Sequence, residues 1–522
     1  MPRLRGKESS DPAASTRKIV KEDDFGPPSL FNREPIDFDL ITQLTHMSAV
    51  ATSGIARDKL FEGTAELDYS TSKYFRRVHR VAQRLNYDYS QACEVVGDAA
   101  RDESVQNLLL HFATALSAGE SEAEFLQRET EVQLELYGKK YERDMESLRK
   151  WTDAYIALMV STTLVVVISL VSMMIYPVGT IAIAGLALVV SMVTAAGGWI
   201  IFTVAPHEVK THRLAKRSAE QTQVDRLAVV LITLAGPVFV LAWLLFNLGI
   251  AMIVSAFLLM PIAWLVWQDD KKIDKRDRDM PAFLRGLGSV MGAVGTTVAE
   301  GLSRLNRRSL GAMEAHVRKL HVRLSNDLPP DLTWARLAGE SGSELVTRCV
   351  RIFSDGIKVG GDPAAVGELA SSFGQKVALL RASRSLVTSS FAFVIVPMHA
   401  ALLGIILFVT EVVLIFGGKI AEVQDQSLTS DIVTEAGVGN AIVFAAPDAG
   451  FIRMLVVVSI IMLTAANSFA PYAAAGGHRY NIFTYAVFMM LISGLSYIII
   501  PEVVQGLFAS VAETPAAGTP VP

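Results

Sequence analysis

The sequence predicts an all-α integral membrane protein with two similar cytoplasmic helical bundles and about seven transmembrane helices. Three observations support this fold class. A polar segment occurs twice, each copy is followed by apolar runs long enough to cross a bilayer, and no alternating apolar pattern of useful strand length is present. Hydrophobic residues make up 51% of the 522 residues and charged residues only 19%, which suits two polar domains and a membrane part.

The duplicated segment covers about residues 46–120 and recurs 241 residues later. HMSAVATSGIARDKLF in the first copy aligns with LGSVMGAVGTTVAEGL in the second, and LHFATALSAGE aligns with RIFSDGIKVGG at the same offset. This register pairs four glycines, Gly54 with Gly295 and Gly119 with Gly360. Because both landmarks keep one register, we expect the two copies to have the same order of helices. The period is too long for a solenoid repeat.

Both copies read as helical, because apolar residues recur every three or four positions. They are Leu40, Leu44, Met47, Val50 and Ala51 in the first copy, and Phe283, Leu287, Val290, Met291 and Val294 in the second. The paired glycines follow the ends of amphipathic stretches, where a helix C-cap favours a left-handed residue. We therefore interpret all four as structural turns. We expect five or six helices in each bundle, and the last helix of each should run into the membrane.

Seven apolar runs are long enough to cross a bilayer. The first four form two hairpins, with Pro177 in the first turn and Asn247-Leu248-Gly249 in the second. The predicted spans are Tyr155–Tyr176, Gly179–Val204, Leu227–Phe246, Ile250–Trp267, Ser390–Phe416, Ile452–Ala470 and Ile482–Ile500.

The distribution of Lys and Arg predicts the orientation in the cell membrane. The loop 205–226 and the flank 268–279 carry five Lys or Arg residues each, whereas the loop 417–450 carries only Lys419 against five acidic residues. The positive-inside rule places the first two in the cytoplasm and the third outside. Both polar copies and the N-terminus are then cytoplasmic, and the C-terminus is outside.

These boundaries divide the chain into six predicted parts. Two are tails, two are cytoplasmic bundles and two are membrane parts. In order they are a flexible cytoplasmic tail (1–38), the first bundle (39–150), four transmembrane helices in two hairpins (151–267), the second bundle (268–388), three transmembrane helices with the outer loop 417–450 (389–505), and an outer tail (506–522).

No residue pattern of an enzyme is present. The sequence contains no GxxxxGK[ST] phosphate loop, no HExxH and no GxSxG. Cys93 and Cys349 have no metal-like spacing, and we expect them to be small buried residues. We therefore predict no catalytic residues, no cofactor and no metal. With a net charge of −4 and no aromatic stacking platform beside the basic run described below, we also predict no nucleic-acid partner.

Ionisable residues are nearly absent from the predicted spans, with His399 and Glu411 of the fifth span as exceptions. A buried ionisable group in a membrane can mark an ion or substrate path. Alternatively, His399 can stay neutral and bond a carbonyl freed by Pro397, and Glu411 can reach the interface. A transporter usually shows several paired polar groups at mid-membrane, which the sequence does not suggest.

The two copies differ in charge. Residues 39–150 contain 14 Lys and Arg against 19 Asp and Glu, net −5, whereas residues 275–388 contain 17 against 11, net +6. Either the basic face is solvated near anionic lipid, or it docks an acidic partner surface. The positive charge is concentrated in a basic run that consists of Arg304, Arg307, Arg308, Arg318, Lys319 and Arg323.

The duplicated segments resemble the F-domain family of inner-membrane platform proteins of type II secretion and type IV pili. The resemblance covers roughly residues 39–500, and the archaeal branch, with the archaellum platforms and their pilus relatives, looks closest. It implies a non-enzymatic platform that binds a hexameric secretion ATPase, receives prepilin- or archaellin-like filament subunits, and couples ATPase motion to subunit insertion. By position, the basic run would contribute to the ATPase contact. A homodimer would give a hexamer a symmetric seat.

Three alternatives remain open from the sequence. Within the class, the filament is either an archaellum or another archaeal pilus. A transporter or channel without its own ATPase is the second alternative, and it requires polar pairs within the membrane. A receptor is the third, but the outer loop of about 34 residues is too small for a ligand domain.

Overall fold

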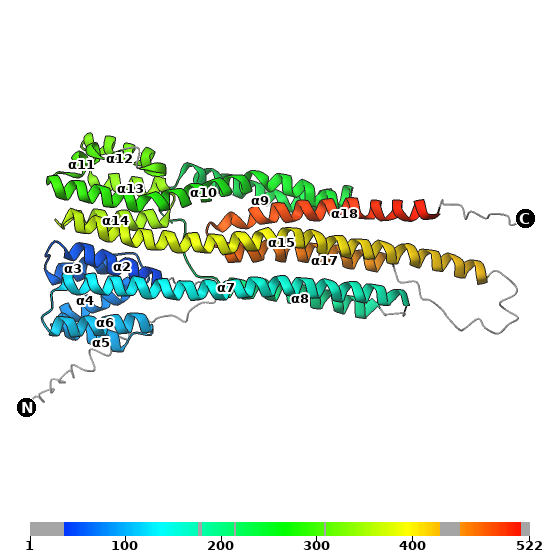
Figure 1. Cartoon of the computed structure of the whole chain (residues 1–522), viewed down its shortest axis with the longest axis horizontal. Coiled ribbons are helices and arrows are strands. Elements are labelled where there is room, and N and C mark those ends of the chain that lie inside the picture. Colours follow the sequence, from blue (N-terminus) through cyan, green and yellow to red (C-terminus); the bar gives the residue numbers. More distant parts are fainter. Residues whose placement is uncertain are drawn as a thin grey trace, which may run out of the picture. The chain divides into compact units, whose positions relative to one another are not determined.

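The computed structural model describes residues 36–175, 180–212, 214, 216–306, 310–428 and 449–512 (Figure 1). Within these residues every extended regular element is a helix, and the single β-bridge pairs Thr211 with Ser343. The predicted all-α class is therefore confirmed. The predicted tails and outer loop lie largely outside the description. However, α15 (Pro363–Leu428) and α18 (Ile482–Ala512) extend well beyond the ends predicted for the fifth and seventh spans.

The chain folds into two compact units. Among the described residues, the polar unit contains those within 36–143, 207–219 and 270–382, and the apolar unit contains the others. The predicted boundaries at 150, 267 and 388 fall close to these borders but inside α7 (Glu122–Ile175), α10 (Leu248–Val294) and α15. No backbone break marks the borders, because each of these helices contributes residues to both units. The last helix of each copy does continue into an apolar stretch, as predicted.

The polar unit holds both copies, and each copy has six helical segments in the same order. The first ends with the start of α7, and the second begins with the end of α10 and finishes with the start of α15. In the first copy, the five helices before α7 are α2 (Ile36–Ala51), α3 (Arg57–Ala65), α4 (Ser72–Leu85), α5 (Tyr89–Asp98) and α6 (Glu103–Ser117). In the second copy, the helices between α10 and α15 are α11 (Val298–Arg304), α12 (Glu314–Ser325) with the short η2 (Gly311–Met313) before it, α13 (Pro330–Ser341) and α14 (Glu344–Lys358).

The four paired glycines adopt the left-handed conformation, with φ of +66°, +74°, +65° and +86° at Gly54, Gly119, Gly295 and Gly360. An added Cβ would meet no atom within 4 Å at any of them, so the backbone conformation and not crowding explains glycine there. In three of the turns the next N–H bonds a carbonyl five residues earlier, as in a Schellman motif. These bonds join Glu120 to Ala115, Thr296 to Met291 and Gly361 to Gly356.

Each copy has its own aromatic core, and helix α2 belongs to both. Phe61, Phe75 and Phe112 centre the first core, and Phe283 and Phe353 lie in the second. The sequence predicted one apolar face for α2, but the helix is buried all round. Leu40, Leu44 and Met47 pack in the first core, whereas Phe38, Ile41 and Ala49 pack in the second. The two copies consequently form one compact unit. Cys93 and Cys349 are free and fully buried, one in each core, as predicted.

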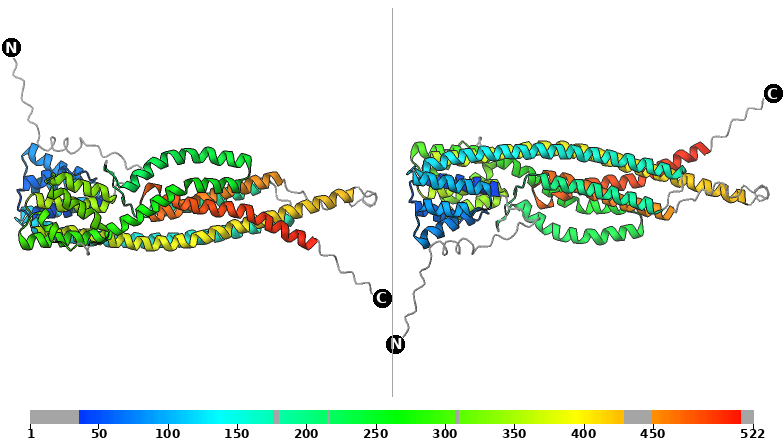
Figure 2. Two further views of the ribbon diagram at one scale, coloured as in Figure 1. Left: turned by 90° about the horizontal axis from the view of Figure 1, so that it is seen from above. Right: turned by 90° about the horizontal axis from the view of Figure 1, so that it is seen from below.

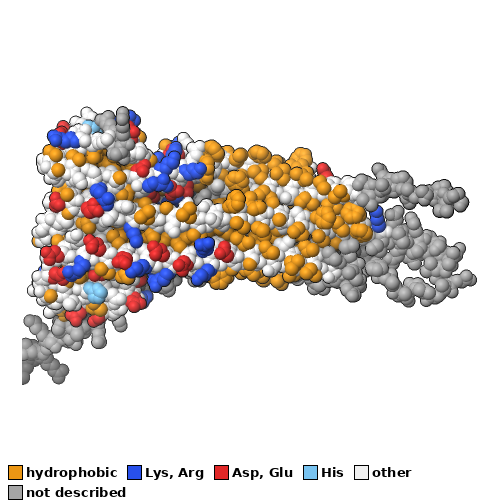
Figure 3. Space-filling view, in the orientation of Figure 1, with side chains coloured by type: hydrophobic (Ala, Val, Ile, Leu, Met, Phe, Trp, Pro, Cys, Tyr) orange, Lys and Arg blue, Asp and Glu red, His pale blue; other side chains and the backbone are white. Residues whose placement is uncertain are grey.

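The apolar unit contains the predicted membrane spans. Six helices are long and apolar enough to cross a membrane, and they correspond to six of the seven predicted spans. The remaining span falls on α8 (Thr180–Val204), whose described apolar stretch is Leu188–Val204. The other helices are α9 (Ala219–Leu245), α17 (Ala449–Ala475) and α18, and α17 packs against both α8 and α18 (Figure 2). On the face drawn in Figure 3, apolar side chains make up most of this unit's coloured surface, whereas Lys, Arg, Asp and Glu gather on the polar unit.

Candidate functional site

The basic run of the second copy is only partly free to meet a partner. Arg307 and Arg308 lie outside the described residues. Arg304 pairs with Glu300 on its own helix at 2.9 Å. On α12, Arg323 pairs with Glu340 at 2.6 Å, and Lys319 lies 3.8 Å from the same carboxylate. Arg318 is exposed.

Glu340 therefore neutralises part of the basic run. It also receives Lys216, at 3.4 Å. Burial alone would raise the pKa of Glu340, but the hydrogen bond and charge of Arg323 outweigh burial and lower it. The sequence could not reveal this, because Glu340 follows the run by 17 residues. Among the described members, Arg318 and Lys319 on α12 are the ones best placed to meet an acidic surface.

A buried polar ladder joins the two copies where α2 packs on α14. Arg348 of α14 pairs with Asp39 at 2.6 Å and with Glu344 at 2.8 Å, and it donates to the Thr42 hydroxyl at 2.8 Å. Its guanidinium also lies 4.2 Å from the ring centroid of Phe38. With its side chain 5% exposed, Arg348 depends on these partners, because an unpaired buried charge is costly.

Further along the ladder, His46 of α2 lies 2.9 Å from Asp355 of α14. Beyond it Gly356 lies beside α2, where an added Cβ would be in ordinary contact with Ala49 at 3.4 Å. Past the ends of both helices the space is tighter, since a Cβ on Gly361 would lie 2.5 Å from the Thr52 hydroxyl. The charge contrast between the copies thus has an internal use, since an acidic residue of the first copy meets a basic residue of the second.

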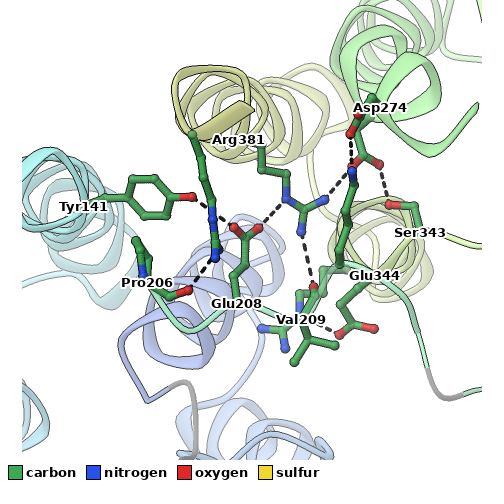
Figure 4. A network of polar contacts seen from close by, with 12 residues as sticks. Tyr141, Pro206, Glu208, Val209, Asp274, Ser343, Glu344 and Arg381 are labelled. Carbon is green, nitrogen blue, oxygen red and sulfur yellow. Dashed lines mark hydrogen bonds and ion pairs between the residues drawn. The ribbon is translucent and has the colours of Figure 1, made fainter. Parts of the chain in front are cut away.

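A second buried network centres on Arg381 of α15 (Figure 4). Its guanidinium contacts Glu208, pairs with Asp277 at 2.5 Å, and donates to the Val209 carbonyl at 3.3 Å. Tyr141 of α7 donates to Glu208 at 3.4 Å, and Ser343 donates to Asp277. Burial would lower the pKa of Arg381, but the two carboxylates outweigh it and raise that pKa, so the guanidinium stays charged.

Glu208 belongs to the connection between α8 and α9, which the sequence suggested was only a basic cytoplasmic loop. Lys210 of this connection is 16% exposed and lies between Asp270 and Asp274, at 2.7 Å from each. Glu344 N–H donates to the Lys210 carbonyl at 3.0 Å. This lysine therefore serves a protein contact, and the positive-inside pattern could not distinguish that use from simple solvation.

Three side chains cap the C-terminal end of α13, where helix carbonyls lack partners. His212 lies 3.0 Å from the Gly339 carbonyl, His316 lies 3.3 Å from that of Glu340, and Arg276 donates to that of Ser341 at 2.6 Å. Burial lowers the pKa of both histidines. They come from the α8–α9 connection and from α12, so distant parts of the sequence fix the α13–α14 turn.

The apolar unit contains a buried chain of hydrogen bonds, contrary to the expectation that polar groups are sparse in the spans. Tyr155 donates to Asn467 at 2.8 Å, and the Asn467 amide lies 2.8 Å from Nδ1 of His399. His399 Nε2 lies 2.9 Å from Ser493, whose hydroxyl lies 2.6 Å from that of Thr464. The chain joins α7, α15, α17 and α18.

The direction of these hydrogen bonds shows which ring nitrogen of His399 carries the proton. Thr464 donates to the Ile460 carbonyl, so Ser493 donates to Thr464 and accepts from His399 Nε2–H. Nδ1 then accepts from Asn467. The reverse direction would leave the Tyr155 proton without an acceptor. His399 is therefore a neutral helix-packing residue, bonded to side chains and not to a carbonyl freed by Pro397.

The described residues contain no group of three His, Cys, Asp or Glu side chains that could hold a metal ion. The buried polar groups described above are paired with one another.

No family model matches the chain. It is similar to two curated proteins, both named Flagella accessory protein J. The one from Methanocaldococcus jannaschii is 23% identical over 330 residues, which are 60% of this chain and 58% of that protein. The one from Methanococcus voltae is 20% identical over 449 residues, 83% of this chain and 78% of that protein. The first match thus spans less than two thirds of that relative's length. The two matches confirm a resemblance to Flagella accessory protein J.

Proposed function

We propose that this chain is the membrane platform on which an archaellum, or a related archaeal pilus, is assembled. The observation that carries the proposal is the similarity to two proteins named Flagella accessory protein J, which extends over 83% of the chain in the longer match. The architecture supports it. Two copies of one helical bundle each continue into an apolar helix, so a polar docking unit and a membrane unit are built from the same helices.

The energy for assembly comes from a partner in this proposal. The sequence has no phosphate loop with which to bind ATP itself. In the proposal a separate hexameric ATPase binds the platform, and the platform passes the motion of that ATPase to incoming filament subunits. We expect the purified chain to hydrolyse no ATP by itself. Hydrolysis that scales with platform concentration after complete removal of the partner would contradict this.

The second copy is the proposed ATPase-binding side. Arg318 and Lys319 are exposed on α12, and the neighbouring Arg307 and Arg308 add charge in sequence. An exposed ion pair is worth about 0.2–1 kcal/mol. Charge there should therefore govern association rate and salt dependence more than final affinity.

The transporter alternative gains one observation, the hydrogen-bond chain through His399. Its side chains are at most 5% exposed. Polar side chains that bond one another across helices are the usual means of holding membrane helices together. The hydrogen bonds through His399 thus favour a role in helix packing over a transport path.

Affinity purification of the tagged full-length protein from native membranes tests the proposal. A hexameric ATPase and filament subunits should be recovered. Arg318→Glu should slow ATPase association and make it less dependent on salt, because less attraction is left for salt to screen. Arg84→Glu, at an exposed arginine of α4 in the first copy, should change neither. Recovery of neither partner with the wild-type protein would refute the platform, and equal effects of both variants would refute the docking side.

A further inference from the structure

Residues 207–212, between α8 and α9, behave as part of the polar unit although they connect two helices of the apolar unit. The whole connection, 205–218, has 14 residues, whereas a connection between neighbouring helices usually needs about 2–8. We call residues 207–212 the strap. Its length and its contacts indicate a function beyond chain connection.

Five helices of the polar unit bind the strap. Glu208 is held by Arg381 of α15 and Tyr141 of α7, and Lys210 is held by Asp270 and Asp274 of α10. Figure 4 shows the Glu208 side of this arrangement. The remaining contacts are to the C-terminal end of α13 and the start of α14, through Gly339, Ser343 and Glu344.

These contacts fix the register of the strap as well as its position. Thr211 forms an antiparallel bridge with Ser343, and Glu344 N–H bonds the carbonyl of Lys210. A shift by one residue would break the bridge and misplace both charged side chains. Because Glu208 and Arg381 are 5% and 8% exposed, water cannot easily replace either partner. The strap is consequently bound to the polar unit through both its backbone and its side chains.

The helix that follows the strap is only lightly packed. In α9 the buried residues are Gln221, Val224, Ala228 and Ala242. A helix with so few buried residues can change position at lower cost than a tightly packed one. A displacement of the strap would therefore be passed along the chain to the start of α9.

We propose that the strap stays bound to the α13–α14 turn of the second copy, and that movement of this turn is thereby transmitted along the α8–α9 connection to α9. The inference rests on the proposed function, because it takes the second copy as the side that receives the partner's force. It differs from docking: a platform with a loosened strap still binds its ATPase but fails to assemble filaments.

The first test loosens the strap in the full-length protein expressed in cells that lack the native copy. Lys210→Met with His212→Ala removes one ion-pair cation and one carbonyl cap. We expect at least a tenfold loss of filaments per cell, with ATPase recovery unchanged within about twofold. Lys275→Met on the exposed side of α10 is the matched control and should assemble normally.

The second test restores the fastening covalently. Thr211 and Ser343 have the non-hydrogen-bonded antiparallel pairing, in which Cα atoms lie about 4.5 Å apart, a spacing that a disulfide spans. Thr211→Cys with Ser343→Cys, added to the loosened variant, should regain filaments on oxidation and lose them on reduction. Cys93 and Cys349 are buried and should not compete.

Normal assembly by the loosened variant would overturn the proposal. Loss of ATPase recovery together with filaments would also overturn it, because the strap would then belong to docking. A third contrary result is arrest of filament assembly when the cross-link alone is introduced into the wild-type platform, because the strap would then have to open. Failure of the proposed function is a separate result, namely wild-type protein that recovers no ATPase at all.

Discussion

At the residue scale, glycines in this protein have two distinct uses. Gly54, Gly119, Gly295 and Gly360 supply positive φ where the space around them is open. Gly356 and Gly361 instead allow close packing, because an added Cβ would lie 2.9 Å from Val366 of α15 at Gly356 and 2.5 Å from the Thr52 hydroxyl, just after α2, at Gly361. Only the first use has a sequence signal, since it follows the end of an amphipathic helix.

The turn glycines should respond to alanine differently from helical glycines. Gly119→Ala forces a left-handed alanine and should destabilise the polar unit by about 1 kcal/mol. Gly63→Ala lies inside α3, where the added Cβ also meets nothing within 4 Å, and should stabilise by about 0.5–1 kcal/mol. Thermal unfolding of both variants in detergent checks this. The same sign of shift for both would contradict the conformational argument.

The two capping histidines should make the polar unit sensitive to acid. Burial lowers the folded-state pKa of His212 and His316, so protons bind the unfolded chain first as the pH falls below about 6.5. The stability they contribute is present above that pH and is lost as the pH falls through their folded pKa values. The unfolding temperature should therefore fall between pH 7.5 and 5.5, and less steeply in a His212→Asn, His316→Asn variant. An unchanged slope would exclude these histidines as the cause.

At the element scale, buried polar side chains decide which helices pair. The α2–α14 ladder joins the two copies, and the His399 chain joins four apolar helices. In water apolar burial drives helix pairing, but lipid removes that force, so hydrogen bonds and close packing matter more in the membrane.

The ladder can be tested with a double-mutant cycle. Arg348→Met leaves Asp39 and Glu344 without their buried cation and should cost about 3–5 kcal/mol of unfolding free energy. Asp39→Asn alone should cost less, and the two changes together should cost less than their sum. Chemical denaturation of the four proteins measures the coupling. Strict additivity would show that Asp39 and Arg348 do not support one another.

The hydrogen-bond chain of the apolar unit can be tested with a matched control on one helix, α17. Asn467→Ala removes the partner of Tyr155 and of His399, and should cost about 1–2 kcal/mol. Ser468→Ala on the same helix removes only a bond to its own helix, at the Thr464 carbonyl, and should cost little. Unfolding in nanodiscs compares them. Equal costs would mean that the chain does not hold the helices together.

At the scale of the whole molecule, the remaining prediction is orientation. The basic loops 205–226 and 268–279 predict, by the positive-inside rule, that they face the cytoplasm and that the turn before α10 faces outward. Asn247 is exposed at that turn, and Ala219 is exposed at the start of α9. Ser218 is buried and would report poorly from either side.

Cysteine labelling of intact cells tests this orientation. An impermeant maleimide should modify Asn247→Cys in intact cells, and Ala219→Cys only after the cells are opened. The native cysteines are buried and give little background. The opposite pattern would invert the topology and place both copies outside.

The sequence by itself determined the helices, the duplication, the four glycine turns and six of the described spans. All of these depend on local patterns: helical periodicity, backbone conformation at one residue, and hydropathy over about 20 residues. The basic run was also visible locally, but its partial neutralisation by Glu340 was not.

Only the tertiary structure decided that α2 lies between two cores, that the α8–α9 connection is a strap, and that His399 belongs to a hydrogen-bond chain. Tyr155 and Asn467 are 312 residues apart, and Glu208 and Arg381 are 173 apart. Each of these residues taken alone is an ordinary polar side chain. Their roles arise from partners that folding brings together from distant parts of the chain, and no local pattern records such a pairing.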